Sequence, residues 1–266
     1  DPAETDDDYP QELFFMSQYT GNLTGRTITT ENQPDLIFNR SSNYAQNWYV
    51  VDSTRVITDN KYILTNETDA EATLPQANFT SVGATSVGIS SGTWLNSTGS
   101  YYKMWMWRAN GGTTSSNSNG SITSTVQVDP SGCFSIVKYT GESATKTIGH
   151  GLSAAPNLII VKSLDDTRKS EDYIAYCFAN CEGYMKFGSY VGNADTDGPF
   201  IYTGFNPSMI FVKLVASAGD WWVEDIQRDT YNPASNYMAF NRTDAQANGI
   251  DIDFLSNGFK IRSTSG

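Results

Sequence analysis

The sequence has little of what most enzyme active sites need. Its 266 residues include one histidine, His150, which stands between two glycines. A Ser-His-Asp or Cys-His arrangement needs a positioned base beside the nucleophile, and no motif around His150 supplies one. One histidine also excludes a His-rich zinc site, and the sequence has no Gly-x-x-x-x-Gly-Lys-Ser/Thr phosphate loop. We therefore expect His150 to be a turn residue and the protein not to be an enzyme.

Cysteines are few, and their number is odd: Cys133, Cys177 and Cys181. If residues 177–181 are extended, the last two lie about 13 Å apart at ~3.3 Å per residue, which is too far for a disulfide. The set does not resemble a disulfide framework, and it fits folding in a reducing cytosol.

Long apolar runs and basic clusters are also missing. No run approaches the roughly 20 apolar residues that cross a bilayer, so we expect no membrane insertion. The formal net charge is -12, and no Lys/Arg cluster offsets it, which argues against a nucleic-acid partner. Residues 1–12 form an acidic arm that lacks the features of a signal peptide.

What is abundant favours strands. Hydrophobic residues make up 39% of the chain and aromatic residues 13%, enough for a sizeable core. Aromatic and β-branched residues suit pleated, half-buried surfaces, whereas the many Gly, Asn and Ser residues suit turns. The composition therefore predicts an all-β protein.

An internal repeat is the strongest signal. The tripeptide Tyr-Thr-Gly begins three similar stretches, at Tyr19, Tyr139 and Tyr202, and each is followed by a proline and an apolar run. The first and third stretches continue in step, and the middle one is shorter. Their matched positions are Trp48, Asp52, Arg55, Trp221, Asp225 and Arg228. We interpret each Asp and Arg as an ion pair that braces one unit, and Trp48 and Trp221 as core residues.

Short apolar segments between turn residues predict a series of strands with the spacing of a sandwich or barrel. They are 12–19, 35–39, 47–52, 61–65, 101–109, 133–139, 157–163, 172–179, 199–203, 208–214, 220–225 and 258–262. Thr-Asp-Ala could cap single helical turns at 68–72 and 243–247.

The domains follow from this pattern. Residues 13–109 are expected to form the first β-sandwich unit, and residues 110–132 a linker and lead-in. The linker prediction comes from 110–121, which is rich in Gly, Ser and Asn. Residues 133–266 form a second β domain, with an abbreviated unit at 133–192 and a third unit at 193–266.

Acidic residues suggest two further sites. Paired carboxylates could serve a glycosidase, but Glu224 and Asp225 would face opposite sides of a strand, and Asp251 with Asp253 would share one face. Asn193 to Gly198 resembles the start of a calcium loop, which makes Asp195 and Asp197 candidate Ca²⁺ ligands, although the expected glutamate at the twelfth position is absent. No other cofactor is expected.

Tryptophans suggest sugar stacking. Trp105 and Trp107 alternate with methionines, so both faces of their strand are apolar and we expect it to be buried. Trp222 and Trp94 are not part of the repeat, and they are the candidates for exposed stacking on a glycan.

Several stretches resemble a repeat in virion proteins of marine tailed phages, including cyanophages. They are Phe134–Gly141, Ile148–Leu152 with the following apolar strand, Tyr173–Ala179, Gly183–Tyr190, Asp197–Phe205 and Asp253–Lys260. The resemblance covers most of residues 13–266. It implies units like concanavalin A-like or laminin G-like sandwiches, in a family often labelled tail fibre or lectin-like, and it brings no catalytic residues.

Two departures from the family pattern lead to a further expectation. The middle unit lacks the segment that usually joins its apolar strand to Tyr173, and Gly266 comes before the closing strand of such units. The third unit is therefore expected either to close alone or to borrow a strand from a neighbour.

These features predict a fold of repeated antiparallel β-sandwich (jelly-roll or concanavalin A-like) units and a non-enzymatic structural protein of a bacteriophage virion: a tail fibre, an appendage or a capsid-surface component assembled in the host cytoplasm. The expected partners are other virion proteins, further copies of the chain in a homo-oligomer, and glycans of the host surface. A lectin-like adhesin is the first alternative, and a polysaccharide depolymerase is the second.

Overall fold

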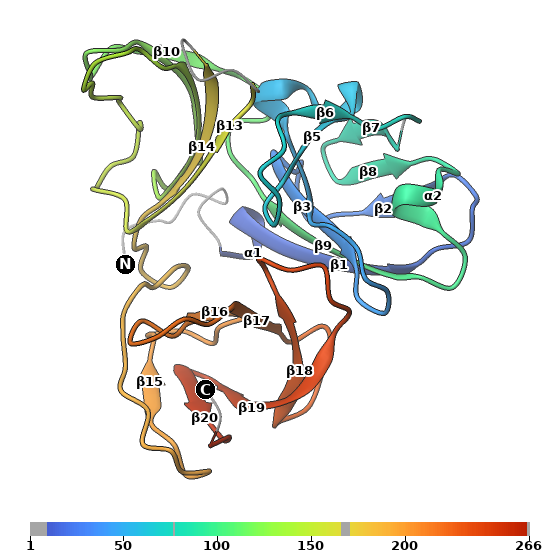
Figure 1. The fold of residues 1–266 in the computed structure, drawn as a ribbon, viewed down its shortest axis with the longest axis vertical. Helices are drawn as coiled ribbons and strands as arrows, with labels where there is room; N and C mark the ends of the chain where they lie inside the picture. The colour runs from blue at the N-terminus through green and yellow to red at the C-terminus, as the bar shows by residue number, and fades with distance from the viewer. Residues whose placement is uncertain (1–9, 77, 166–170, 265–266) are drawn as a thin grey trace.

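A computed structural model describes residues 10–76, 78–165 and 171–264, which form four antiparallel sheets (Figure 1). The all-β prediction is confirmed. The helices of the described residues are single turns: α1 (Pro10–Leu13), α2 (Thr93–Asn96), and the 3-10 turns η1 (Ser53–Arg55) and η2 (Ile57–Asp59). None of them is long or apolar enough to span a membrane.

The first unit is a two-layer sandwich. Its large sheet has the order β1 (Phe14–Thr20), β9 (Tyr101–Trp107), β3 (Leu36–Ser41), β4 (Tyr49–Asp52), β5 (Lys61–Leu64), β6 (Ala72–Thr73). The second layer is β2 (Arg26–Thr29), β8 (Ser86–Ile89), β7 (Phe79–Gly83). Ile37, Val51 and Met106 of the large sheet pack against Val87 and Ile89 of the small one and form the core between the layers.

The middle sheet contains five strands in the order β10 (Ser115–Asn117), β11 (Ser124–Val128), β12 (Phe134–Thr140), β14 (Asp172–Phe178), β13 (Leu158–Ser163). The linker predicted at 110–132 is therefore wrong, because this segment supplies β10 and β11. The N–H groups of Gly111 and Gly112 also donate to the buried Asp35 carboxylate, which ties the segment to the first unit.

The third sheet has six strands in the order β15 (Phe200–Tyr202), β20 (Gly258–Ile261), β19 (Ala247–Leu255), β18 (Ala234–Ala239), β17 (Trp221–Asp225), β16 (Met209–Lys213). It curls so that β19 and β20 lie across from β16 and β17 (Figure 1). The sheet thereby encloses its own small core, which includes Ile210, Ile252 and Ile261.

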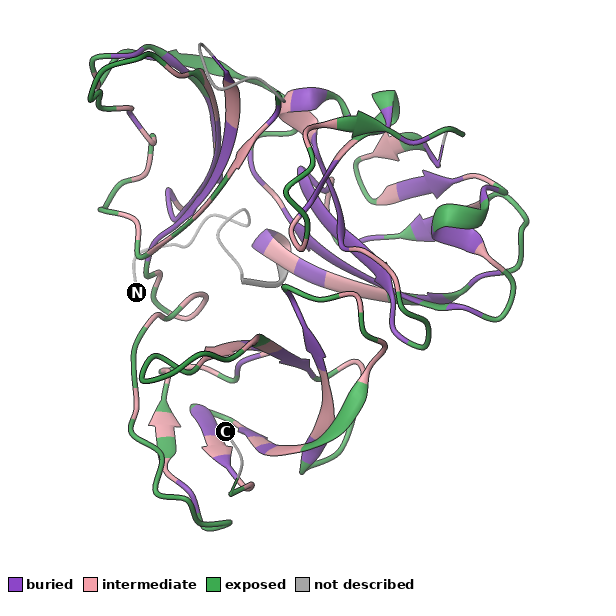
Figure 2. Ribbon diagram, in the orientation of Figure 1, coloured by how far each residue is buried: buried purple, intermediate pink, exposed green. Residues whose placement is uncertain are grey.

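A third core joins the three main sheets. Phe38 and Trp105 of the first sheet, Tyr176 of the middle sheet and Val223 of the third belong to one cluster of buried side chains. The aromatic contacts cross the boundaries: the Phe38 ring lies 6.2 Å from that of Tyr176. In Figure 2 the buried residues follow the strands that face this junction, and every residue of β3 is buried.

Arg40 on β3 fastens the third sheet to the first. Its guanidinium is fully buried and donates to the backbone carbonyls of Ala239, Arg242, Thr243 and Asp244. Trp48 lies 4.8 Å beneath the guanidinium and donates from Nε1 to the Ala239 carbonyl at 2.9 Å. Burial, together with the charge of Arg228, lowers the pKa of Arg40 to about 10.

Strand pairing in the first and third units follows the same register. On β3 and β4, Ile37 lies opposite Val51, and on β16 and β17, Ile210 lies opposite Glu224. Val50 opposite Ile63 likewise corresponds to Val223 opposite Met238. Equivalent positions can therefore be compared directly, and Glu224 occupies the position of Val51.

All twelve predicted strands are present, with ends shifted by a few residues. The helical turns predicted at 68–72 and 243–247 are wrong, since the first segment enters β6 and the second enters β19. Glu71 shows the physical reason in the first case: its carboxylate binds Arg55 at 3.0 Å and Lys61 at 3.3 Å, and these contacts hold the segment extended beside β5.

Candidate functional site

Asp52 and Arg55 brace the end of β4, as the sequence predicted. Asp52 accepts from the Arg55 N–H at 3.1 Å and from Arg55 Nε at 2.7 Å, and both side chains are almost fully buried. Tyr176 of the middle sheet donates its hydroxyl to Asp52 at 2.8 Å and accepts from Arg55 at 3.3 Å. Burial, followed by the Asp52 charge, raises the pKa of Tyr176 well above its usual value, so the phenol stays protonated.

The second brace, Asp225 with Arg228, has the same local geometry. Arg228 Nε lies 2.7 Å from Asp225 Oδ2, and the Arg228 N–H donates to Asp225 Oδ1 at 3.0 Å. It lacks the extra partners of the first brace, because Arg228 Nη1 is buried with no hydrogen-bond acceptor among the described residues. Both pairs are internal supports, and neither is open to a substrate.

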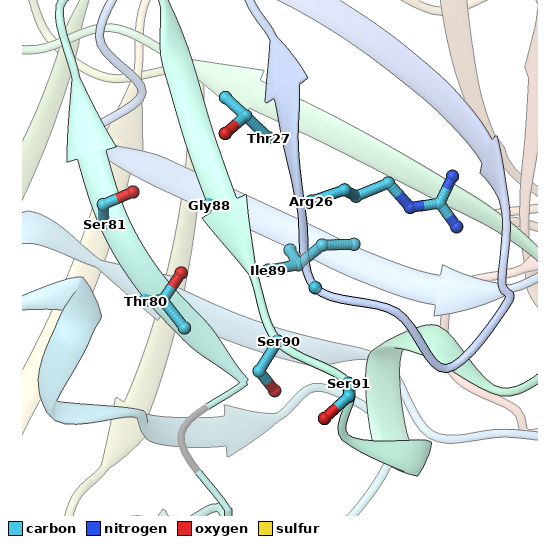
Figure 3. A pocket seen from close by; sticks show the side chains of 9 residues that line it. Arg26, Thr27, Thr80, Ser81, Gly88, Ile89, Ser90 and Ser91 are labelled. Atoms are coloured by element: carbon cyan, nitrogen blue, oxygen red, sulfur yellow. The ribbon is translucent and has the colours of Figure 1, made fainter.

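A polar groove lies on the outer face of the small sheet in the first unit (Figure 3). Its volume is about 470 Å³, and it runs over β2, β8 and β7. The lining residues are Gly25, Arg26, Thr27, Thr80, Ser81, Gly88, Ile89, Ser90 and Ser91. The sequence did not reveal this site, because its strands consist largely of small residues without a clear apolar pattern.

Gly88 forms the floor of the groove. An irregularity of β7 between Phe79 and Ser81 brings Thr80 and Ser81 together over Gly88, and a Cβ atom there would overlap both hydroxyl oxygens. A side chain at this position would therefore have to displace both hydroxyls. In the described part of the chain, the hydroxyls of Thr27, Thr80 and Ser81 have no hydrogen-bond partner, so all three are available to a ligand.

Trp94 follows the groove in sequence, on α2. Its side chain is partly exposed, and its ring meets Tyr49 edge-on at 5.5 Å, which leaves part of the indole open. Its predicted role in glycan stacking stays a prediction.

The predictions for Trp221 and Trp222 are wrong, and both errors have the same cause. Trp48 is fully buried as predicted, but Trp221 is 38% exposed because its ring lies beyond the rim of the shared core. Trp222 is half-buried, meets Tyr237 at 4.8 Å and lines an internal cavity of the third sheet, so it is not the exposed residue that was predicted. Neighbouring strand residues face opposite sides, and the sequence did not show which side of β17 is covered.

The predicted calcium ligands are engaged otherwise. Asp197 binds Lys260 at 2.7 Å, and the hydrogen bond from Lys260 lowers the pKa of Asp197. Asp195 accepts from the Asp197 N–H at 2.8 Å. Among the described residues, no group of three or more His, Cys, Asp or Glu side chains could hold a metal ion. The Ca²⁺ prediction is thus left without a ligand set in this region.

The remaining chemical candidates have structural contacts. His150 Nδ1 accepts from the Leu152 N–H at 3.0 Å, and the ring orders its loop. Cys133, Cys177 and Cys181 are free thiols. Asp253 pairs with Arg262 at 2.6 Å, and Glu224 and Asp225 face opposite sides of β17 as predicted.

The fold defines a multi-sheet, all-β protein with internal ion-pair braces and an open hydroxyl-lined groove. The family model described as "Domain of unknown function (DUF7483)" matches residues 9–170 and again residues 163–266, so the chain belongs to this family. The two braces fall in separate matches, Asp52 with Arg55 in the first and Asp225 with Arg228 in the second. No curated protein and no solved structure matches the chain.

Proposed function

We propose that the chain is a non-enzymatic structural protein of a bacteriophage virion, exposed as a fibre, an appendage or a capsid-surface component. One observation carries the structural role: three sheets share a single aromatic core, and the buried charged groups of Arg40, Asp52 and Arg55 hold these sheets together. A protein that bears load between partners needs this kind of rigidity. The placement in a phage rests on the resemblance of the sequence stretches named above.

Localisation in purified particles tests this proposal. An antibody against the chain, labelled with gold and viewed by electron microscopy, should decorate intact virions at a regular position. Label found only on host debris, with none on particles, would overturn the proposal. Light scattering at high concentration tests the expected homo-oligomer, and a strictly monomeric mass would count against it.

Glycan binding is the second candidate function, and the groove favours it. Sugars are recognised by fixed hydrogen-bonding groups, and Thr27, Thr80 and Ser81 present three free hydroxyls around the glycine floor. The lining residues come from three neighbouring strands and the turn after β8 (Figure 3). The proposed ligand is therefore a hydroxyl-rich segment of a surface polysaccharide.

Two isosteric variants test the groove. Thr27→Val and Thr80→Val each remove a hydroxyl without changing the shape of the side chain, and both should lose signal on a glycan array. Thr29→Val, two residues further along β2 and also exposed, is the matched control and should bind as the original protein does. Equal binding by all three variants would exclude this groove as the glycan site.

A further inference from the structure

Glu224 is the most unusual buried group in the molecule. It is 2% exposed, its Oε2 atom has no hydrogen-bond partner among the described residues, and it lines a cavity inside the third sheet. The rest of the lining is aliphatic or aromatic, including Tyr190, Ile210, Trp222 and Ile252. The cavity measures about 10 Å³, the lower limit for a single water molecule, so little water can reach the Oε2 atom.

The equivalent position in the first unit shows which kind of residue packing alone would favour at position 224. Val51 stands there, opposite Ile37, and it is fully covered by the second layer. A valine side chain can be buried there without losing a hydrogen bond. Burying a carboxyl that has no hydrogen-bond partner costs free energy, most of all when the carboxyl is ionised. The carboxyl of Glu224 therefore makes the closed third sheet sensitive to protonation, and the first unit lacks this property.

The charges around Glu224 do not compensate its burial. Arg228 favours the ionised form, but its Nε and Nη2 atoms donate to Asp225 and to the Val223 carbonyl, and its Nη1 atom makes no hydrogen bond to Glu224. The charges of Asp229, Asp251 from β19 and Asp225 oppose ionisation, and Tyr190 packs against the cavity from the segment before β15. Burial, partly offset by Arg228, raises the pKa of Glu224 to about 8.

We propose that Glu224 is a proton-controlled latch of the third sheet. While the carboxyl holds its proton, β16 and β17 stay packed on β19 and β20. When the proton leaves, the carboxylate seeks water, and these two halves of the sheet separate.

The opening is confined to the third sheet because the cavity is lined only by this sheet and Tyr190. The cluster that includes Ile210 and Ile252 is separate from the core shared by the three sheets. Separation would expose this apolar cluster, a surface suited to apolar association, and would leave Arg40 and the first unit in place. The latch thus links proton concentration to the exposure of one apolar surface.

Hydrogen exchange measured by mass spectrometry on the full chain tests the latch. After correction for the intrinsic pH dependence of exchange, amides of β16–β20 should open more often at pH 9 than at pH 6, by up to roughly 100-fold if the open state fully hydrates the carboxyl. Amides of β3, β4 and β9 should not respond. Infrared difference spectroscopy on the same protein should show a protonated carboxyl disappear over the same pH range.

Glu224→Gln keeps the shape and cannot ionise, so the third sheet of this variant should lose its pH response. Glu224→Val, which copies the first unit, provides a second variant without an ionisable group. Glu182→Gln, in an exposed turn, is the matched control and should behave as the original protein does. A pH response that persists in both Glu224 variants, or that spreads equally over all three sheets, would overturn the proposal.

Discussion

The two Asp–Arg braces allow one substitution to be compared in two settings within the same chain. Arg55→Met and Arg228→Met each keep an unbranched, flexible side chain, although a shorter one, and remove the charge. Each leaves a buried aspartate, Asp52 or Asp225, without its partner. Stranding one member of a buried ion pair costs about 3–5 kcal/mol, so we expect both variants to be destabilised in this range.

The first brace should be the more costly one to break. Arg55 also donates to Tyr176 at 3.3 Å and to Glu71 at 3.0 Å, whereas Arg228 has a buried nitrogen with no acceptor among the described residues. Glu71 keeps its ion pair with Lys61 in this variant, so the loss of the Arg55–Glu71 contact contributes little to the difference in stability. A hydrogen bond from a charged group contributes about 1.5–3 kcal/mol, and the long distance to Tyr176 favours the lower end. Arg55→Met should therefore cost about 1.5 kcal/mol more than Arg228→Met.

Urea denaturation followed by circular dichroism measures both free energies of unfolding. Adding Tyr176→Phe completes the test: it should couple to Arg55→Met by at least ~0.5 kcal/mol and should be additive with Arg228→Met. Equal costs for the two arginine variants, or a larger cost at Arg228, would refute the view that the first brace joins two sheets and the second supports only one.

Three further predictions concern single positions. Glu224→Gln should raise the free energy of unfolding by about 3 kcal/mol at pH 7 and leave it unchanged at pH 4. The pKa of Glu224 is about 8 in the folded protein instead of 4.5, which destabilises the folded state by ~1.4 kcal/mol for each pH unit between 4.5 and 8. Denaturation curves of the original protein and of the variant should therefore differ at pH 7 and coincide at pH 4. Arg40→Lys should cost about 2–4 kcal/mol in the same assay, because an ammonium group cannot reach four carbonyls, whereas Arg242→Lys on the surface should change stability by less than ~1 kcal/mol. Gly88→Ala should cost about 1–3 kcal/mol by forcing β7 away from β8, and an unchanged unfolding midpoint would show that the groove floor is not tightly packed.

The apolar strands could be predicted from the sequence, and the small second layer could not. Strands such as β9 and β14 carry aromatic and β-branched side chains on a continuous apolar run, which is a strong local signal. β2, β7 and β8 consist mainly of Ser, Thr, Gly and single aliphatic residues, and only their packing on the large sheet makes them strands. Tertiary burial decided their structure, and local propensity did not.

The sites divide in the same way. The ion pairs of Arg55 and Arg228 could be predicted because both partners are close in sequence and recur at the same spacing. Trp221 and Trp222 were assigned to the wrong faces because exposure depends on which sheet covers which side of β17. Glu224 was considered only as a catalytic partner of Asp225, and its isolation in an apolar cavity depends on the curl of the third sheet, which has no local signal.

The docking of the third sheet through Arg40 has a consequence for how this protein can vary. Arg40 and Trp48 bind carbonyl groups of the main chain between Ala239 and Asp244, and such groups are the same for every amino acid. The exposed side chains of this segment, Asn241, Arg242 and Asp244, can therefore be exchanged while the path of the backbone is kept, whereas Phe240 is held in the shared core. Substitutions that adapt the outer surface to a new partner should accumulate there, and the two residues on the first unit should stay fixed.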